Sequence, residues 1–300
     1  MLYNAIITGM RNLRAYIGFV MIFVLTACSS PVNQPSEKTI TTIENKGSDT
    51  MVNLALAWAE AYQMLHPEIN ISVTGGGSGT GIASLQNGTV EIANASRAIK
   101  EEEAVDLQAK GLPPSEYVVA RDAIAVIVNP SNPVNQLTLQ QVSDIYSGKI
   151  NNWREVGGDD RPIVRLSRET NSGTHVYFLE SVLRLGEKEN KTLFSPDTLL
   201  LPSSVGIISE VRDNPNAIGY DGLGYVTDEV KVVALADQVG DEFVLPSADT
   251  VNQELYPISR DLYMYTAGEI TPEVAQYLEW LISPEAQAIV EELGFVPISP

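Results

Sequence analysis

The stretch Gly75-Gly76-Gly77-Ser78-Gly79-Thr80-Gly81 lies between an alternating run at residues 69–73 and an apolar run that begins at Ile82. This pattern predicts a strand, a tight turn and the start of a helix. Glycines let the backbone approach a ligand closely, and the amides at a helix start attract an anion. On its own the stretch also fits a flexible turn in which Ser78 or Thr80 caps the helix, and it matches neither the dinucleotide nor the P-loop pattern.

Two other turns repeat the same arrangement of hydroxyl groups. Gly47-Ser48-Asp49-Thr50 follows a predicted strand at residues 39–45, and Asn171-Ser172-Gly173-Thr174 follows one at residues 163–166. An apolar helical pattern begins directly after each turn. Together the three turns predict a site where hydroxyls and amides surround one small tetrahedral oxyanion. The alternative is three independent helix caps, each worth about 1 kcal/mol to its own helix.

The chain has 300 residues and a formal net charge of −19. So strong an acidic balance argues against non-specific binding of nucleic acid. The hydrophobic content of 44% is ordinary and allows a real core. An anionic ligand would have to be held by local donors against a repulsive overall field.

The first 27 residues have the pattern of a bacterial lipoprotein signal peptide. Arg11 and Arg14 precede an apolar segment at residues 15–27, which is too short for a comfortable membrane span. The segment ends in Leu25-Thr26-Ala27-Cys28, so we expect Cys28, the single cysteine, to become the lipidated N-terminus. Cleavage removes two arginines and no acids, leaving a charge of −21. An ordinary signal peptide or an uncleaved anchor is the alternative.

Residues 28–38 contain two prolines and no apolar periodicity, which indicates a flexible tether. Beyond the tether, strand and helix patterns alternate, as in an α/β fold with mostly parallel sheets. One apolar run, residues 117–128, is interrupted by Arg121-Asp122. A charged pair there marks either a strand that crosses between two domains beside a cleft, or a salt bridge at a strand end.

From about residue 40 to residue 300 the sequence resembles the phosphate-binding proteins of bacterial phosphate-specific ABC transporters, the PstS family. The resemblance rests on the three turns and on several further motifs, which are Ala95-Ser96-Arg97, Ser167-Arg168-Glu169, Ile145–Ile150 with Trp153, Ala217–Tyr220, Ser283–Gln287 and Gly294–Pro297. It implies the type II fold of periplasmic binding proteins, in which two α/β lobes with mostly parallel sheets close on the ligand in the cleft between them. We assign residues 39–122 and 257–300 to lobe 1, and residues 123–256 to lobe 2.

The resemblance also implies the ligand positions. They are Ser48, Thr50 and Met51 in the first turn, Ser78, Gly79 and Thr80 in the second, and Arg168, Ser172, Gly173 and Thr174 in the third. Some family members carry an aspartate shortly after the third strand, where this chain has Ser96-Arg97. We include Ser96 and Arg97 as candidates, with a salt bridge from Arg97 to an acid such as Glu101 as the alternative.

A carboxylate can separate phosphate from sulfate, because only phosphate keeps a proton to donate near neutral pH. Sulfate would face that carboxylate with no donor between two negative charges. The candidates are Asp122, our first choice because it lies on the predicted crossing strand, and Asp49. Asp49 could instead favour only its own helix start through the helix dipole.

These residues indicate a binding protein and not an enzyme. The chain has two histidines: His66 fits a helix end, and His175 fits a supporting or surface group better than a general base. We expect no cofactor and no metal. The predicted function is a monomeric, lipid-anchored protein on the outer face of the membrane that captures inorganic phosphate for the permease of an ABC importer. The alternatives are a binder of molybdate, tungstate or sulfate, a phosphate-signalling subunit and, most remotely, a hydrolase.

Overall fold

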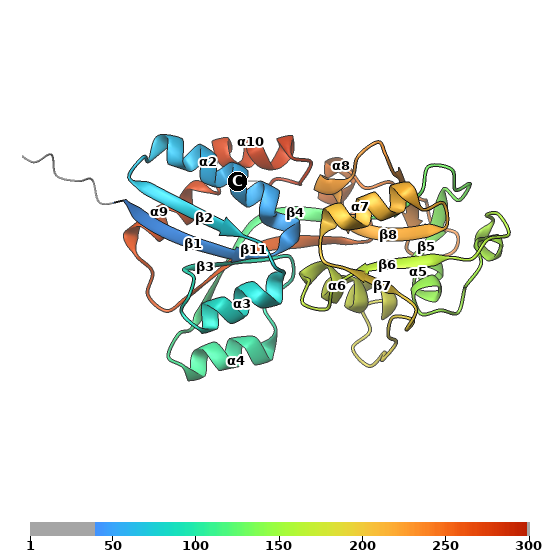
Figure 1. Cartoon of the computed structure of the whole chain (residues 1–300), viewed down its shortest axis with the longest axis horizontal. Coiled ribbons are helices and arrows are strands. Elements are labelled where there is room, and N and C mark those ends of the chain that lie inside the picture. The colour runs from blue at the N-terminus through green and yellow to red at the C-terminus, as the bar shows by residue number, and fades with distance from the viewer. Residues whose placement is uncertain (1–39, 299–300) are drawn as a thin grey trace, which may run out of the picture. The chain divides into compact units, whose positions relative to one another are not determined.

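The computed structural model describes residues 40–298 (Figure 1). The predictions on the signal peptide at 1–27, on the tether at 28–38 and on Cys28 lie outside these residues. Within them, no helix is both long enough and apolar enough to cross a membrane.

The first part of the main sheet is parallel. Strand β1 (Thr41–Gly47) pairs with β2 (Ile69–Thr74) on one side and with β3 (Ile92–Ala95) on the other. Each of these three strands is followed by a segment that holds candidate residues of the site. Because the carboxyl ends of parallel strands meet at one edge of a sheet, these segments lie near one another. The strands predicted at 39–45 and 69–73 are both present, and their ends lie within two residues of the predicted ends.

Two long antiparallel strands connect this part of the sheet to the next. Residues 114–123 of β4 (Pro114–Val128) pair with β11 (Ser259–Ala267), and residues 124–128 pair with β8 (Ala217–Gly222). On its other side β11 pairs with β3. The apolar run that carries Arg121-Asp122 is thus one continuous strand shared by both halves of the sheet.

The second part of the sheet is again parallel at its outer strands. Strand β6 (Val164–Arg168) lies between β8 and β7 (Leu199–Leu201). The short β9 (Lys231–Val232) pairs with β4, while β5 (Gln136–Thr138) and β10 (Ala234–Ala236) form a separate two-stranded sheet. Because Arg168 is the last residue of β6, its side chain is placed at the same kind of strand end as the first two turns.

Helices cover both faces of the first part. The 3₁₀ turn η1 (Asp49–Met51) leads into α2 (Val52–Leu65), which packs with α10 (Pro284–Glu292). Helices α3 (Ser78–Gln86) and α4 (Glu101–Ala109) lie on the opposite side of the strands, and α9 (Pro272–Trp280) precedes α10 (Figure 1). In α2, Leu54, Trp58 and Tyr62 recur at helical spacing and are all buried.

The second part is covered in the same way. Helix α7 (Ser204–Asp213) packs on β8 and β6 from one side, with α5 (Leu139–Tyr146) and α6 (Gly173–Phe178) on the other (Figure 1). The π-helical turn η3 (Leu179–Leu183) continues α6, where the sequence pattern predicted one regular helix. Shorter elements complete this part, namely η2 (Trp153–Val156), η4 (Leu223–Tyr225) and α8 (Ala248–Asn252).

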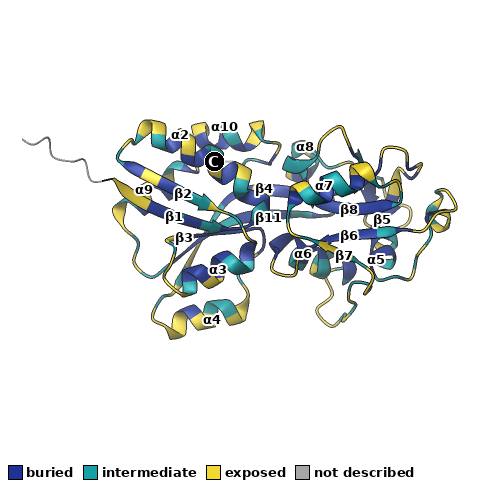
Figure 2. Cartoon of the chain, in the orientation of Figure 1, coloured by how far each residue is buried: buried dark blue, intermediate teal, exposed yellow. Residues whose placement is uncertain are grey.

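Buried side chains form two main apolar clusters, and β4 contributes to both. Val119 and Ala120 belong to the cluster around Trp58 and Tyr277, whereas Ala123 and Ile124 belong to a second cluster. The same change falls between Ile258, just before β11, and Leu262 on β11. The strands are buried along much of their length, and exposed residues gather on the outer faces of the helices (Figure 2). The division into lobes at 122 and 257 stays a prediction, and the change of core lies at those positions.

Helix α4 has no counterpart among the elements predicted from the sequence. Its residues, Glu-Glu-Glu-Ala-Val-Asp-Leu-Gln-Ala, bury only Leu107 and so give no apolar stripe. Three glutamates in its first turn favour the positive end of the helix dipole, and Glu103 bonds back to the Lys100 amide. Local electrostatics rather than burial define this helix.

Candidate anion-binding site

The glycine-rich turn at residues 75–81 lies against the third turn. The Gly79 amide donates to the carbonyl oxygen of Asn171 at 3.1 Å, and Asn171 Nδ2 donates to the Gly76 carbonyl at 2.9 Å. Gly77 has a φ of +92°, and a Cβ there would lie 2.8 Å from Asn171 O. A side chain at position 77 would therefore separate the two turns.

Hydroxyl groups from the three turns meet in the interior. Thr50 Oγ1 lies 2.8 Å from Thr174 Oγ1, across 124 residues of sequence. Ser78 Oγ accepts from the Ser96 amide at 3.1 Å and lies 3.3 Å from Ser96 Oγ. All four side chains are at most 1% exposed. Gly173 packs so closely against Ser78 and Ser96 that a Cβ would overlap both hydroxyls.

These hydroxyls do not act as helix caps. The N-cap residues of η1, α3 and α6 are Ser48, Gly77 and Ser172, and in the described structure none accepts a cap hydrogen bond through its side chain. Ser48 Oγ is buried and has no hydrogen-bond partner within residues 40–298. The alternative of three independent side-chain caps is therefore wrong for this chain.

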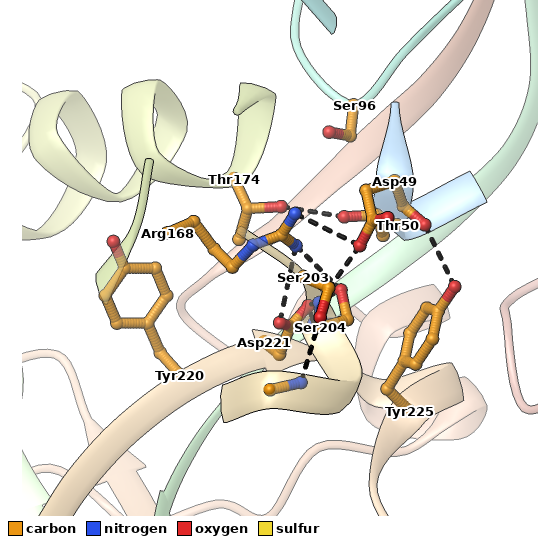
Figure 3. A network of polar contacts seen from close by, with 12 residues as sticks. Asp49, Thr50, Ser96, Arg168, Thr174, Ser203, Ser204, Tyr220, Asp221 and Tyr225 are labelled. Atoms are coloured by element: carbon orange, nitrogen blue, oxygen red, sulfur yellow. Dashed lines mark hydrogen bonds and ion pairs between the residues drawn. The ribbon is translucent and has the colours of Figure 1, made fainter. Parts of the chain in front are cut away.

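Arg168 is the cation at the centre of the group (Figure 3). Its side chain is 1% exposed, Nη1 donates to Ser204 Oγ at 2.7 Å, and Nη2 donates to Asp49 Oδ2 at 3.1 Å and to Pro202 O at 3.0 Å. Nε is buried without a partner among the described residues. The guanidinium therefore keeps one unused donor, its Nε–H, and a guanidinium is well shaped to bind a tetrahedral oxyanion.

Two aspartates and one serine hold this guanidinium. The Ser204 amide donates to Asp49 Oδ2 at 3.0 Å, and Ser204 Oγ donates to Asp221 Oδ1 at 3.0 Å. Asp221 Oδ2 lies 3.6 Å from Arg168 Nη1 and accepts no hydrogen bond in the described part of the chain. Burial raises the pKa of Asp221, and the charge of Arg168 works in the opposite direction. Tyr225 fixes the first turn by donating its hydroxyl to Asp49 O at 2.9 Å (Figure 3).

Asp122 has its main partner on the neighbouring strand. Arg260 on β11 donates to Asp122 Oδ2 from Nη2 at 2.9 Å and from Nε at 3.3 Å, and the Leu223 amide donates to Oδ1 at 3.1 Å. Burial raises the pKa of Asp122, and Arg260 opposes this shift. Its neighbour Arg121 pairs separately with Asp261 at 3.5 Å. The charged pair thus lies within the strand that both halves of the sheet share, and each member has an ion-pair partner on β11.

Comparisons with known proteins agree with this geometry. The profile of the PBP superfamily domain matches residues 32–285. The chain is 34% identical over 273 residues to the phosphate-binding protein PstS of Pseudomonas aeruginosa, covering 85% of this chain and 83% of the relative. It is also 34% identical over 264 residues to PstS of Bacillus subtilis, covering 88% and 83%. The chain belongs to the PstS family.

Solved structures of this family have the same fold. A phosphate ABC transporter substrate-binding protein from Clostridium perfringens, solved with bound phosphate, superposes with a TM-score of 0.76 at 33% identity, covering 86% of this chain and all of that one. An ABC-type phosphate transport receptor from Vibrio cholerae gives 0.69 at 30% identity, with the same coverage. The predicted α/β type II binding-protein fold is confirmed. The names of these relatives describe binding proteins, not enzymes.

Both terminal nitrogens of Arg97 are paired in this PstS-family structure, while its Nε is buried without a partner among the described residues. Its Nη1 and Nη2 donate to Glu103 at 2.8 and 2.6 Å, and Nη1 also donates to Ala98 O. The structure therefore has the salt-bridge alternative, with Glu103 as the acid in place of Glu101. Burial by itself would raise the pKa of Glu103, but hydrogen bonds from Arg97 and the Lys100 amide lower it.

Four other candidates are present at the turns but are bonded to groups of the same turn or of a neighbouring turn. The Met51 amide donates to Ser48 O at 3.1 Å, and its side chain packs in the core around Trp58. The Gly79 amide is held by Asn171, Thr80 Oγ1 lies 3.4 Å from Asn171 Nδ2, and the Ser172 amide donates to Glu169 O at 2.9 Å. Their roles as ligands stay predictions, and the amides of Met51, Gly79 and Ser172 would have to exchange partners to bind an anion.

The histidines have the local surroundings that the sequence indicates. His66 ends α2 and stacks on Tyr62 with a centroid distance of 4.3 Å. His175 stacks on Phe194, and its Nδ1 lies 3.0 Å from Ser167 Oγ. Burial lowers the pKa of His175. Within residues 40–298 no three His, Cys, Asp or Glu side chains are grouped to hold a metal ion.

Sequence reasoning missed Ser204, Asp221 and Arg260. Ser204 follows the α7 cap residue Ser203, and Asp221 lies near the end of the buried strand β8, so neither belongs to one of the three turns. Arg260 did leave a signal, because it is a single cation inside the extended segment 256–265, just as Arg121-Asp122 interrupts the apolar run of β4. The ion pair follows from these two interruptions only once β4 and β11 are known to be neighbours.

Proposed function

We propose that this chain binds inorganic phosphate on the outer side of the cytoplasmic membrane and delivers it to the permease of an ABC importer. The observation that carries the proposal is the group of uncapped turns. Their hydroxyls are buried, and Arg168, which bonds to Asp49 of the first turn, has an Nε without a partner among the described residues. The names of the relatives from Pseudomonas aeruginosa and Bacillus subtilis support the choice of phosphate.

The proposed ligand set is Arg168 together with hydroxyls and amides of the three turns. Thr50 and Thr174 now bond to each other, and Ser78 bonds to Ser96, so each pair could exchange its mutual bond for bonds to phosphate oxygens. Hydrogen bonds to a charged group, in a site that excludes water, are stronger than those between neutral groups. Short-range donors can therefore hold an anion although the chain carries −19, because salt screens the distant acids.

For the carboxylate that accepts the phosphate proton, two contacts support Asp49 over our first choice, Asp122. Asp122 already accepts three hydrogen bonds, from Arg260 twice and from Leu223, out of the roughly four that a carboxylate can take. Asp49 is in the first turn and shares Arg168 with the proposed ligand. Sulfate beside Asp49 would place two negative charges together without a proton between them.

We also propose that residues 39–122 with 257–300 form one lobe and residues 123–256 the other, and that they close on the ligand. The exchange of apolar clusters along β4, and between Ile258 and Leu262 at the start of β11, supports this division. Among the contacts that join the proposed lobes at the site are two between candidate residues of the site, from Asp49 to Arg168 and from Thr50 to Thr174. Both would break when the lobes separate to release phosphate to the permease.

Calorimetric titration of phosphate-stripped protein tests the function. We expect saturable binding of phosphate at one site, with no binding of molybdate or sulfate at the same concentrations. Molybdate or sulfate binding in place of phosphate would establish the alternative oxyanion. Absence of binding by all three would contradict the proposal and favour a signalling role that has lost the ligand.

The lipid anchor is a separate proposal, supported by Leu25-Thr26-Ala27-Cys28 at the end of the apolar segment. We expect the full chain in the membrane fraction and the Cys28→Ser variant in the soluble extracytoplasmic fraction. The control is Ser29→Ala, which changes the next residue and leaves the thiol in place. Persistent membrane attachment of Cys28→Ser would contradict lipidation.

A further inference from the structure

Arg260 is a second buried arginine in contact with a candidate residue of the site, Thr174, and none of the three turns contains it. Its side chain is 2% exposed, on strand β11, which pairs with the shared strand β4. Nη2 donates to Thr174 Oγ1 at 3.0 Å as well as to Asp122, and Nη1 donates to Ser96 O at 2.9 Å. The guanidinium also lies 5.6 Å from the ring centre of Tyr177 on α6.

These contacts restrict the hydroxyl of Thr174. A guanidinium can only donate, so Thr174 Oγ1 must accept from Arg260. The hydrogen of Thr174 then points away from Arg260, and the other group within hydrogen-bonding distance is Thr50 Oγ1 at 2.8 Å. Thr174 is in this way prepared to donate toward the place where the three turns meet.

The partners of Arg260 also come from both sides of the site. Ser96 follows β3 in proposed lobe 1, Thr174 lies in the first turn of α6 in proposed lobe 2, and Asp122 anchors the guanidinium on the shared strand β4. One side chain therefore holds a carbonyl on one side and a hydroxyl on the other at a fixed separation. In the arrangement of this structure, with the proposed lobes in contact, Arg260 thereby sets the position of Thr174.

We propose that Arg260 is a positioning residue for the anion: it acts through Thr174, whose hydroxyl it holds as a donor toward phosphate. The proposal rests on the proposed function, since phosphate is the ligand to which Thr174 would donate. It differs from a purely structural role in β11, where Arg260 would only neutralise Asp122. A structural role predicts the same loss of affinity whether or not residue 174 carries a hydroxyl.

A double-mutant cycle separates these roles, with phosphate affinity measured calorimetrically on the full chain purified in detergent. Arg260→Lys keeps the charge beside Asp122 but loses the planar fork. Thr174→Val removes the hydroxyl at nearly constant size. We expect Arg260→Lys to weaken phosphate binding about 10-fold in the wild-type background and less than about 2-fold beside Thr174→Val. The matched control is Arg121→Lys on β4, an exposed arginine with its own partner Asp261, which should leave the affinity unchanged.

Equal losses in the two backgrounds would overturn the proposal and leave Arg260 as a structural ion pair. If the wild-type chain itself binds no phosphate, both this proposal and the proposed function fail. If it binds and the cycle shows no coupling, only the role of Arg260 fails. Should Arg260→Lys not fold, Asp122→Asn with Arg260→Gln removes both charges together. That pair can be compared with Asp122→Asn alone, with and without Thr174→Val.

Discussion

Two kinds of helix start use the same residues for different purposes. Five α-helices among residues 40–298 begin at a Ser or Thr whose side chain accepts a backbone N–H within the first turn, and these are Thr138, Ser203, Ser247, Thr271 and Ser283. At the three turns of the candidate site, Ser48, Gly77 and Ser172 make no such bond. There the hydroxyls of Thr50 and Ser78 bond to residues from distant parts of the chain.

The difference teaches that a hydroxyl at a helix start stabilises the helix only when it is used locally. A cap contributes about 1 kcal/mol to its own helix and nothing to a ligand. A hydroxyl that is kept for a distant partner leaves the helix amides unfilled and can bond to an anion instead. Substitutions at the two kinds of start should therefore separate stability from affinity.

The largest effect is expected at Arg168, which bonds to Asp49 of the first uncapped turn. Arg168→Gln should weaken phosphate binding on the order of 100-fold, because it removes charged donors from a buried site. It should also lower the free energy of unfolding by about 3–5 kcal/mol, since Asp221 would stay buried without its cation. Calorimetric titration and urea unfolding measure the two effects.

Arg97→Gln is the matched control, because Arg97 is also buried but pairs with Glu103. It should lower stability and leave the phosphate affinity within about 2-fold of wild type. A loss of affinity as large as that of Arg168→Gln would restore Arg97 as a phosphate ligand.

Thr50→Val tests a hydroxyl of the uncapped kind. We expect about 10-fold weaker phosphate binding, equivalent to about 1.4 kcal/mol, with a smaller change in the free energy of unfolding. The reason is that Thr50 Oγ1 bonds to Thr174 and not to its own helix. A large loss of stability with normal affinity would mean that Thr50 is structural after all.

Ser283→Ala tests the capped kind at the start of α10, where Ser283 Oγ accepts the Ala286 amide at 3.3 Å. The free energy of unfolding should fall by about 1 kcal/mol, and the phosphate affinity should not change. Urea unfolding and calorimetry on the same preparation measure both. Weaker phosphate binding would erase the distinction between the two kinds of start.

The smallest effect concerns His175, which follows Thr174 in the third turn. Burial lowers its pKa, so the folded chain binds that proton less readily than the unfolded chain, whose histidine titrates near pH 6.5. His175 should therefore leave the free energy of unfolding unchanged above about pH 6.5 and lower it as the pH falls below that value, by at most about 1.4 kcal/mol per pH unit. His175→Gln should flatten this decline between about pH 6.5 and 5 in urea unfolding. His66→Gln, at the end of α2, is the control, and an equal flattening there would contradict the assignment.

Much of the fold could be predicted from the sequence because its signals are local. The alternating run before Gly75, the helical spacing of Leu54, Trp58 and Tyr62, and the turns between them all correspond to elements of the structure. Helix α4 was missed because electrostatics and a back-bonded Glu103 define it instead of an apolar stripe. The π-helical turn after Phe178 departs from the 3.6-residue period that sequence patterns assume.

The residues of the candidate site likewise fall into those that a local sequence pattern reveals and those that it does not. The residues of the three turns carry local patterns, so their neighbourhood could be predicted. The partner of Arg97, the pair of Asp122 with Arg260, and the carboxylate of Asp221 depend on which strands lie side by side. Only the strand order β3-β11-β4-β8 brings Arg260 between Ser96 and Thr174, and one sequence does not reveal that order.

Competition between anions tests the central claim most directly. Residues 29–300 would be titrated with phosphate in the presence of a roughly 100-fold excess of sulfate, because selectivity is a difference between two affinities. We predict one phosphate bound per chain with an affinity unchanged by sulfate, and loss of that selectivity in Asp49→Asn but not in Asp122→Asn. Displacement of phosphate by sulfate, or no phosphate bound at all, would contradict the account.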